Sequence, residues 1–430
     1  MLSRLLVVLI VLSIAVAGCT GNTTPTASHP TAPAPTASAN PTATPTATFT
    51  ATATTAPPSP TPSPTPSPTV APPIATSAPA IGSSAAARQV VNLGVPVGNT
   101  YLVQTAATDT ERGIAYILSQ GGDVNPNGGV LTAVNLLTGQ VQHSLAIPAT
   151  LDFTSTAALS ADGTRLYAIG HREGNAMLLV LATGTGDVPL GEELGNLPDV
   201  RTLALDPADN ALYVAGNGQI RRLDALTLKE ELSTPAGDLL QDPAVPFIAV
   251  NHQARRLYLS RPGGAAIAVY NADTLSRLPD ITLGMSVFGL VAHPSSSQTY
   301  ARTESYSGGQ RLTKVAVMDQ DQQVRFWDTD PGYQIGQMLV NPATGDVVLL
   351  EDGFYQDVST SRIRTITPDT GDVRDTIPLP YLNLTYARGY ALLENTLYRL
   401  DTTIIPVDLS TAETGNPIRL EIKPVSAILD

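Results

Sequence analysis

The chain has 430 residues, a formal net charge of −13 and a single cysteine, Cys19. Its only lysines are Lys229, Lys314 and Lys423, so it lacks the clustered positive charge that nucleic acid or an anionic lipid surface would require. With one cysteine, internal disulfides and metal sites built from several thiolates are excluded.

The first eighteen residues have the pattern of a secretion signal. Arg4 precedes an apolar run over residues 5–16, which is shorter than the roughly 20 residues that span a bilayer. The run ends in the letters VAGC at Cys19, which resemble the lipobox of bacterial lipoproteins. The resemblance implies cleavage after Gly18 and a diacylglyceryl group on Cys19, whose acyl chains would anchor the chain to the membrane. The alternative is an ordinary signal peptide with an incidental cysteine.

Residues 19–87 consist mainly of Thr, Pro, Ala and Ser, and residues 20–87 contain no Asp, Glu, Lys or Arg. Such a composition cannot form a core and predicts a disordered linker rich in polyproline II conformation. At ~3.1 Å per residue, the linker would reach somewhat under ~200 Å when extended. Its Thr and Ser beside Pro are typical of O-glycosylated stalks and equally of bare linkers.

Residues 88–430 contain a repeat that predicts the fold. A strand with an apolar–Tyr pair recurs every 42 to 51 residues, anchored at Tyr116, Tyr167, Tyr213, Tyr258, Tyr300, Val348 and Tyr398. Between these anchors, period-two alternation and turns such as Leu-Thr-Gly and Asp-Thr-Gly indicate short antiparallel strands without helices. Seven units of four strands predict an all-β propeller of seven blades. An eight-bladed ring is the alternative, because residues 90–95 and 425–429 look like surplus strands that would close the ring.

The letters ALYVAGNGQIRRLDALTLKEEL, which begin at Ala211, resemble the YVTN-type repeat of β-propellers. The resemblance extends over about residues 100–422 and is weaker in the last three units, the sixth of which has Val348 in place of tyrosine. Relatives of this kind include surface-layer proteins, lactonase-like enzymes and quinoprotein-like folds. The repeat therefore implies a blade and does not specify a chemistry.

Candidate binding residues gather in the loops of one propeller face, where strands two and three connect and where one blade joins the next. The set is acidic with a few arginines: Asp123, Asp152, His171, Arg172, Asp199, Arg302, Glu304, Asp328, Glu351 and Asp352. Oxygen ligands of this kind suit a divalent cation such as Ca²⁺, or they suit a protein, peptide or glycan. For any one residue alone, solvation at the surface is the simpler interpretation.

The other motifs in the sequence give weaker evidence for a functional site. Residues 319–323 lack the glycine and glutamate of a calcium loop and are predicted to form a hairpin turn. His252 and His293 occupy the same turn of successive units, on the opposite face, and are not expected to share a metal. Trp327, the only tryptophan, is expected to be buried against a neighbouring blade, with a sugar-stacking platform as the alternative. No Gly-x-Ser-x-Gly or His-Glu-x-x-His motif is present.

The sequence therefore favours a cell-envelope lipoprotein, anchored through Cys19, whose extracytoplasmic propeller is a binding or scaffold module. The sequence names no catalytic set. The alternative is a lactonase-like or metal-assisted hydrolase that uses the acidic loops. A third possibility is a structural surface-layer component that self-associates.

Overall fold

The computed structural model describes residues 103–120, 128–147, 149–151, 156–184, 190–240, 245–307, 310–330, 332–355, 358–380, 389–400, 403–411 and 418–419. The predicted signal, the linker and the two surplus strands at residues 90–95 and 425–429 lie outside these ranges. Among the described residues, no helix is long and apolar enough to cross a membrane.

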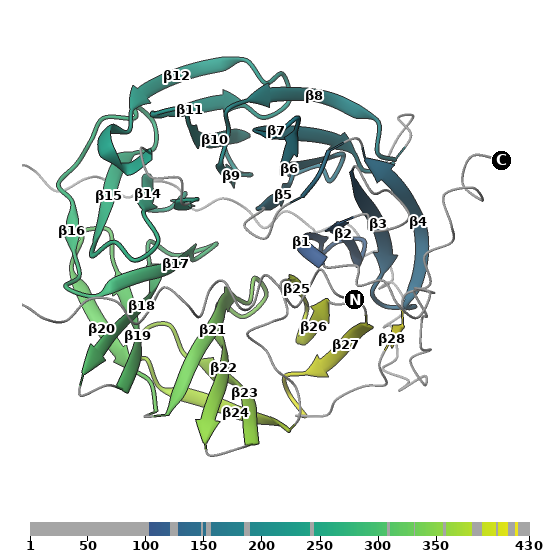
Figure 1. The fold of residues 1–430 in the computed structure, drawn as a ribbon. Helices are drawn as coiled ribbons and strands as arrows, with labels where there is room; N and C mark the ends of the chain where they lie inside the picture. The colour runs from purple at the N-terminus through teal and green to yellow at the C-terminus, as the bar shows by residue number, and fades with distance from the viewer. Residues whose placement is uncertain are drawn as a thin grey trace, which may run out of the picture. The chain divides into compact units, whose positions relative to one another are not determined.

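The described residues form seven four-stranded antiparallel sheets around an axis (Figure 1). Blade one comprises β1 (Val103–Asp109), β2 (Ile114–Gln120), β3 (Gly129–Asn135) and β4 (Gln140–Ile147). Blade two comprises β5 (Ala157–Leu159), β6 (Arg165–Arg172), β7 (Asn175–Ala182) and β8 (Glu193–Pro198). Blade three comprises β9 (Thr202–Asp206), β10 (Ala211–Gly216), β11 (Gln219–Asp224) and β12 (Glu230–Pro235), followed by the short 3₁₀ helix η2 (Gly237–Leu240).

Blade four comprises β13 (Phe247–Asn251), β14 (Arg256–Ser260), β15 (Ala266–Asn271) and β16 (Ile281–Thr282). Blade five comprises β17 (Ser286–Ala292), β18 (Thr299–Ser307), β19 (Gln310–Met318) and β20 (Val324–Asp328). Blade six comprises β21 (Tyr333–Val340), β22 (Val347–Tyr355), β23 (Val358–Ile366) and β24 (Val373–Pro380). Blade seven comprises β25 (Gly389–Leu393), β26 (Thr396–Leu400), β27 (Thr403–Asp408) and β28 (Ile418–Arg419).

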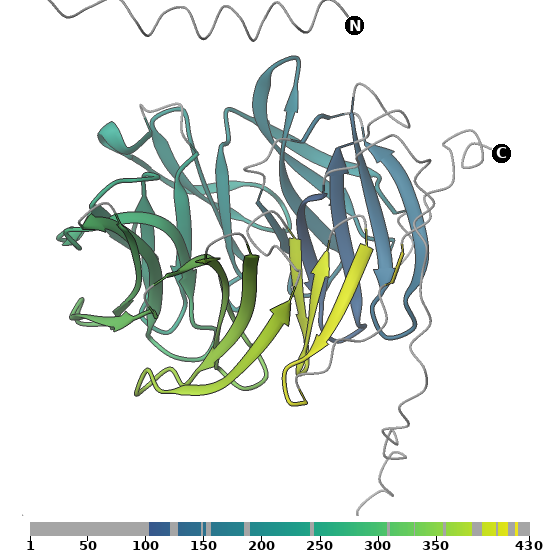
Figure 2. The same ribbon diagram turned by 60° about the horizontal axis from the view of Figure 1, so that its bottom comes forward.

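The predicted seven-bladed propeller is confirmed, and the eight-bladed alternative is wrong. Every repeat anchor lies on the second strand of its blade, from Tyr116 on β2 to Tyr398 on β26. The first strand of each blade is innermost, and neighbouring first strands such as β9, β13 and β17 contact one another. The blue first blade and the yellow last blade stand side by side in Figure 2, where β1 contacts β25. Apolar side chains of blades one and seven, including Ile117 and Leu393, pack across this closure.

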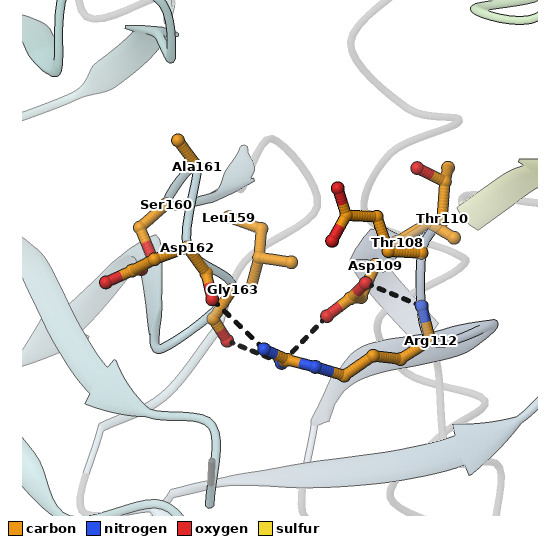
Figure 3. A pocket seen from close by; sticks show the side chains of 10 residues that line it. Thr108, Asp109, Thr110, Arg112, Leu159, Ser160, Ala161, Asp162 and Gly163 are labelled. Carbon is orange, nitrogen blue, oxygen red and sulfur yellow. Dashed lines mark hydrogen bonds and ion pairs between the residues drawn. The ribbon is translucent and has the colours of Figure 1, made fainter. Parts of the chain in front are cut away.

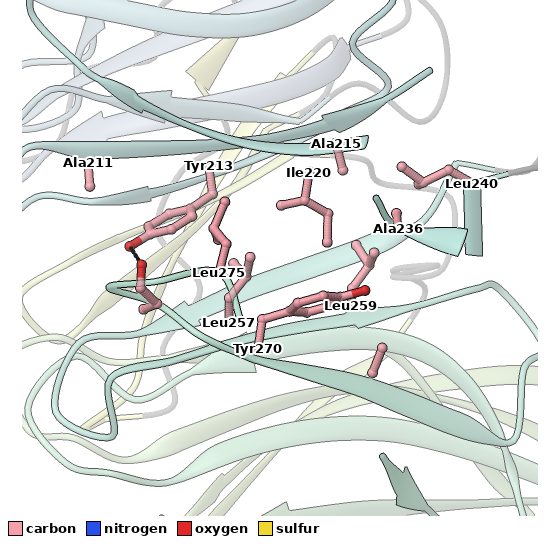
Figure 4. Packing of buried hydrophobic residues seen from close by; sticks show 12 residues of the cluster. Ala211, Tyr213, Ala215, Ile220, Ala236, Leu240, Leu257, Leu259, Tyr270 and Leu275 are labelled. Carbon is pink, nitrogen blue, oxygen red and sulfur yellow. Dashed lines mark hydrogen bonds between the residues drawn. The ribbon is translucent and has the colours of Figure 1, made fainter. Parts of the chain in front are cut away.

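The blades hold together through apolar seams, because each sheet buries both of its faces. On β10, Ala211, Tyr213 and Ala215 pack against Leu257 and Leu259 of blade four (Figure 4). The alternating residues of β10 pack toward blade two. This two-sided burial explains why the second strands read as nearly continuous apolar runs.

In blades two and three the repeated tyrosine has a further role at the seam, because its hydroxyl donates to a carbonyl of the next blade. The Tyr167 hydroxyl donates to the Ala225 carbonyl at 2.7 Å, and the Tyr213 hydroxyl donates to the Ala272 carbonyl at 2.9 Å. Both acceptors directly follow the third strand of the next blade. A tyrosine suits this position since its ring fills the seam while its tip satisfies a buried carbonyl.

The predicted hairpin turns between third and fourth strands are also present. The Asp224 carboxylate accepts bonds from the Thr227 backbone N–H and hydroxyl, both at 2.7 Å. In residues 319–323, the Asp319 carboxylate accepts from the backbone N–H groups of Asp321 and Gln323, both at 2.9 Å. This segment is therefore a turn, as predicted. Trp327 is buried beside Tyr300 of its own blade, with ring centroids 5.4 Å apart, and it packs in one cluster with Ile335 and Val347 of blade six. The expectation of burial against a neighbouring blade is therefore confirmed.

Candidate functional site: a charged seam between blades five and six

The two ends of the ring carry different connections, because antiparallel strands alternate in direction. We call the end with the second-to-third-strand hairpins and the blade-to-blade connections, such as residues 199–201, the hairpin face. The other end, with turns such as residues 207–210 and 225–229, is the turn face. The sequence positions of the candidate residues predict that they lie on the hairpin face.

Blades five and six differ from the others at the hairpin face. Their middle strands β18, β19, β22 and β23 each have nine residues, whereas the middle strands of the other five blades have five to eight. Side chains alternate along a strand, so Tyr300, Arg302 and Glu304 share one face of β18. Tyr300 packs against blade six in an apolar cluster with Leu349. The added length therefore carries Arg302 and Glu304 into the same seam, above its apolar part.

The upper part of this seam is charged. We call it the charged seam, and it consists of Arg302, Glu304, Arg311, Asp330, Tyr333, Gln334, Glu351, Arg362 and Arg364. Two ion-pair groups and one isolated cation occupy it.

The first group joins the two blades through Arg311. The Glu304 carboxylate, only 2% exposed, accepts two bonds from Arg311, one of them from Nε at 2.7 Å. The Arg311 Nη1 donates to the Gln334 Oε1 of blade six at 2.7 Å. A two-point guanidinium–carboxylate contact fixes both planes, so Arg311 is held in one orientation at the seam.

The second group surrounds Glu351, which is 0% exposed. Its carboxylate accepts a bond from Arg362 Nε at 2.6 Å and another from Arg364 Nη2. Arg362 also pairs with Asp330 at 2.6 Å, and its Cζ lies 3.6 Å from the Tyr333 ring centroid. Burial alone would lower the pKa of Arg362, but the Glu351 and Asp330 carboxylates outweigh it and the pKa is raised.

The isolated cation is Arg302. Its Nη1 donates to the Ile335 carbonyl at 3.0 Å and to the Gly336 carbonyl, where β21 bulges against β22. The Phe288 ring lies 5.8 Å from its Cζ. Within the described ranges, no carboxylate contacts Arg302. Burial lowers the pKa of Arg302, which the nearby Glu304 charge opposes in part.

Three of the ten candidate residues, Arg302, Glu304 and Glu351, are brought together here. Asp328 lies at the exposed outer edge of blade five, where it pairs with Lys314 at 2.7 Å. Asp352 is buried and accepts a bond from Ser361; it points to the opposite side of the blade-six sheet from its neighbour Glu351.

The remaining candidates are elsewhere. Arg172 pairs with Glu193 within blade two at 2.9 Å, and His171 precedes it on the same strand. Asp199 has a φ of 59° and its backbone carbonyl closely approaches Gly216 in blade three. Asp123, Asp152 and the predicted lipid-bearing Cys19 lie outside the described residues.

The expectation of solvated loop residues is wrong for Glu304, Glu351 and Asp352, which lie within strands at 2%, 0% and 4% exposure. The second strands β18 and β22 continue through these residues, beyond the ends that the sequence pattern predicts. Arg311, Arg362 and Arg364 lie on the third strands β19 and β23 and are not among the predicted residues. Glu351 stands directly opposite Arg362 in the pairing of β22 with β23. Extending the hairpin and pairing opposite charges across it would have been the available signal.

The charged seam does not match the oxygen cage expected for Ca²⁺. Glu304 and Glu351 already accept guanidinium bonds, so their oxygens are committed to arginine. In the described part of the chain, the one group of three potential ligands is Asp206, Asp209 and His252, on the turn face. Arg255 pairs with Asp209 there and its Nη1 lies 3.1 Å from His252 Nδ1, so a cation already occupies the group.

His252 and His293 contact different blades. His252 Nδ1 lies 3.0 Å from the Asp206 carboxylate of the preceding blade. His293 Nε2 lies 3.0 Å from the Gly345 carbonyl of the following blade. Both histidines therefore connect adjacent blades.

A recess lies on the turn face between blades one and two (Figure 3). It has a volume of about 160 Å³ and is lined by residues 108–112 and 159–163. Arg112 crosses it, pairing with Asp109 at 2.9 Å and donating to the Asp162 carbonyl at 3.1 Å. These bonds identify Arg112 as a link between blades.

Comparison with known proteins supports the fold. No protein-family model matches this chain, and no curated protein matches it in sequence. Among solved structures, it is similar to Sqt1 of Saccharomyces cerevisiae, with 10% identity over 77% of this chain and 89% of that one, and a TM-score of 0.51. It is also similar to a chain in a crystal structure of a mitotic checkpoint complex, with 12% identity over 82% and 99% and a TM-score of 0.50. At these identities the likeness shows a propeller fold alone.

Proposed function

We propose that this chain is a lipid-anchored binding or scaffold module of the cell envelope, and that its propeller recognises a partner on the hairpin face at blades five and six. The lipid on Cys19 would hold it to the membrane, and the linker of residues 19–87 would space the propeller from that membrane. The VAGC motif at Cys19 supports the envelope location.

The charged seam is the observation that carries the binding proposal. The guanidinium groups of Arg311, Arg362 and Arg364 are fixed by carboxylates, and that of Arg362 also by the Tyr333 ring, before any partner arrives. Arg311 is partly exposed, and Tyr306, two residues beyond Glu304 on β18, is 74% exposed. Tyrosine and arginine supply much of the binding energy of protein interfaces, and preorganised side chains lose little entropy on binding.

The hydrolase alternative receives less support from this geometry. A general base or a metal ligand needs a carboxylate with free oxygens. Glu304 and Glu351 instead engage arginines through both of their oxygens. Their arrangement suits the positioning of donors for a ligand.

Site-specific photo-crosslinking on intact cells tests the binding proposal. A crosslinker at Tyr306 reports on the hairpin face, and a matched one at Leu137, which is 58% exposed in a turn of blade one, reports on the turn face. The proposal expects a discrete crosslinked product from position 306 and none from position 137. Equal products from both positions, or a product from position 137 alone, would refute it.

The anchor is tested separately by metabolic labelling with a palmitate analogue. The wild-type chain should take up label and sediment with membranes, and Cys19→Ser should do neither. Label retained by Cys19→Ser would contradict lipidation at that residue.

A further inference from the structure

The charged seam has an imbalance of charge. Four guanidinium groups, those of Arg302, Arg311, Arg362 and Arg364, face three carboxylates, those of Glu304, Glu351 and Asp330. Among the described residues the seam therefore holds one surplus positive charge, in a protein whose net charge is −13.

The surplus charge belongs to Arg302, which is held by carbonyls and an aromatic ring. A desolvated cation is costly unless an anion compensates it. The surroundings of Arg302 screen its charge less than bulk water does. Its positive potential therefore adds to that of Arg311 and Arg362 in the same seam.

The contact between Asp330 and Arg362, at the exposed end of the seam, shows how an oxyanion would be held. Asp330, on the connection between β20 and β21, is largely exposed, and its carboxylate pairs with Arg362 Nη2 at 2.6 Å. The buried face of the same guanidinium pairs with Glu351 and stacks on Tyr333. Asp330 is thus an exposed carboxylate on a preorganised arginine, at a position that an external oxyanion can take over.

We propose that the charged seam binds an oxyanion, namely the carboxylate or phosphate group of a ligand. This oxyanion displaces the Asp330 carboxylate from Arg362 and also accepts hydrogen bonds from Arg311. This inference rests on the proposed function and names the chemical class of its ligand. The planar forks of arginine match both oxyanions. Arg302 supplies the uncompensated charge beneath them.

Trp327 provides a built-in reporter. It is the only tryptophan in the chain and packs in the apolar part of the same seam, with Tyr300 and Leu349. The full chain is titrated with sodium phosphate and, separately, with sodium glucuronate, against sodium chloride at equal ionic strength. The proposal expects a saturable change in Trp327 fluorescence with at least one of the two oxyanions and none with chloride.

Three variants test which residues determine the affinity for the oxyanion. Asp330→Asn removes the competing carboxylate and should tighten binding several-fold, whereas Arg311→Gln removes a donor and should weaken it by roughly tenfold or more. Asp328→Asn is the matched control, because it removes an equal charge from a neighbouring exposed aspartate that pairs with Lys314 at the outer edge. It should change the affinity much less than Asp330→Asn.

The fluorescence titration distinguishes support for the oxyanion site from its refutation. Saturation by phosphate alone, or by glucuronate alone, identifies the source of the oxyanion and supports the site. Absence of a saturable response to both, or equal effects of Asp330→Asn and Asp328→Asn, overturns it. A crosslink at Tyr306 that persists in that case would leave the proposed binding face standing with a different ligand chemistry.

Discussion

The seam tyrosines allow a graded test of how the blades are held together. Tyr213 is buried, and its hydroxyl donates to the buried Ala272 carbonyl of the next blade at 2.9 Å. Tyr213→Phe keeps the ring in the seam and leaves that carbonyl without its donor. A buried acceptor that loses its partner costs about 1–3 kcal/mol, so the free energy of unfolding should fall by that amount.

The chain contains its own control for this substitution. The Tyr116 hydroxyl is 3.5 Å from the Thr183 carbonyl, at the limit of a hydrogen bond, whereas the Tyr167 hydroxyl is 2.7 Å from the Ala225 carbonyl. Tyr167→Phe should therefore cost as much as Tyr213→Phe, and Tyr116→Phe should cost little.

Guanidinium chloride unfolding of the full chain, followed by far-UV circular dichroism, measures the three midpoints. Equal losses in all three variants would mean that the hydroxyl bonds are not what distinguishes them. The largest loss in Tyr116→Phe would refute the reasoning outright.

Three further predictions concern burial and close packing. Glu351→Gln leaves the guanidinium groups of Arg362 and Arg364 without their buried counter-charge and should lower the free energy of unfolding by about 3–5 kcal/mol, measured by the same denaturant titration. Burial raises the pKa of Tyr213 to about 12, so the unfolded tyrosine ionises from about pH 10 while the folded one stays neutral. The contribution of Tyr213 to stability should therefore be complete below pH 10 and fall by up to about 1.4 kcal/mol per pH unit toward pH 12. Because burial also raises the pKa of other tyrosines such as Tyr167, the test is the difference in pH slope between the wild-type chain and Tyr213→Phe, whose stability should fall less steeply by up to that amount. Gly216→Ala places a Cβ 1.8 Å from the Asp199 carbonyl oxygen, so the backbone must move and the free energy of unfolding should fall by at least ~1–3 kcal/mol. Gly289→Ala is the control, because its Cβ would meet nothing nearer than 3.7 Å. It should unfold at nearly the wild-type midpoint.

The fold could be predicted because each blade repeats the same local pattern. A tyrosine marks the second strand in six blades, directly after an apolar residue in five of them and after Thr299 in blade five, and Val348 takes that place in blade six. Turn residues such as Asp224 and Thr227 mark where the third strand ends. These signals lie within a few residues of one another, so no knowledge of long-range contacts is needed to read them.

The charged seam could be predicted only in part. Arg302, Glu304 and Glu351 were assigned to the correct face by their positions after second strands. Their burial was missed because it depends on strand length and on the packing of blade five against blade six. The partners Arg362 and Arg364 come from the other strand of the hairpin, so they are recognisable only once the pairing register is known.

Hydroxyl-radical footprinting of the full chain tests most directly whether blades five and six present the binding face. Oxidation rates at Tyr306 on the hairpin face and at Leu137 on the turn face are compared between intact cells and the purified chain. We expect Tyr306 to be protected on cells while Leu137 oxidises at its free rate. Protection of Leu137 with Tyr306 unprotected would place the partner on the other face and contradict the proposed site.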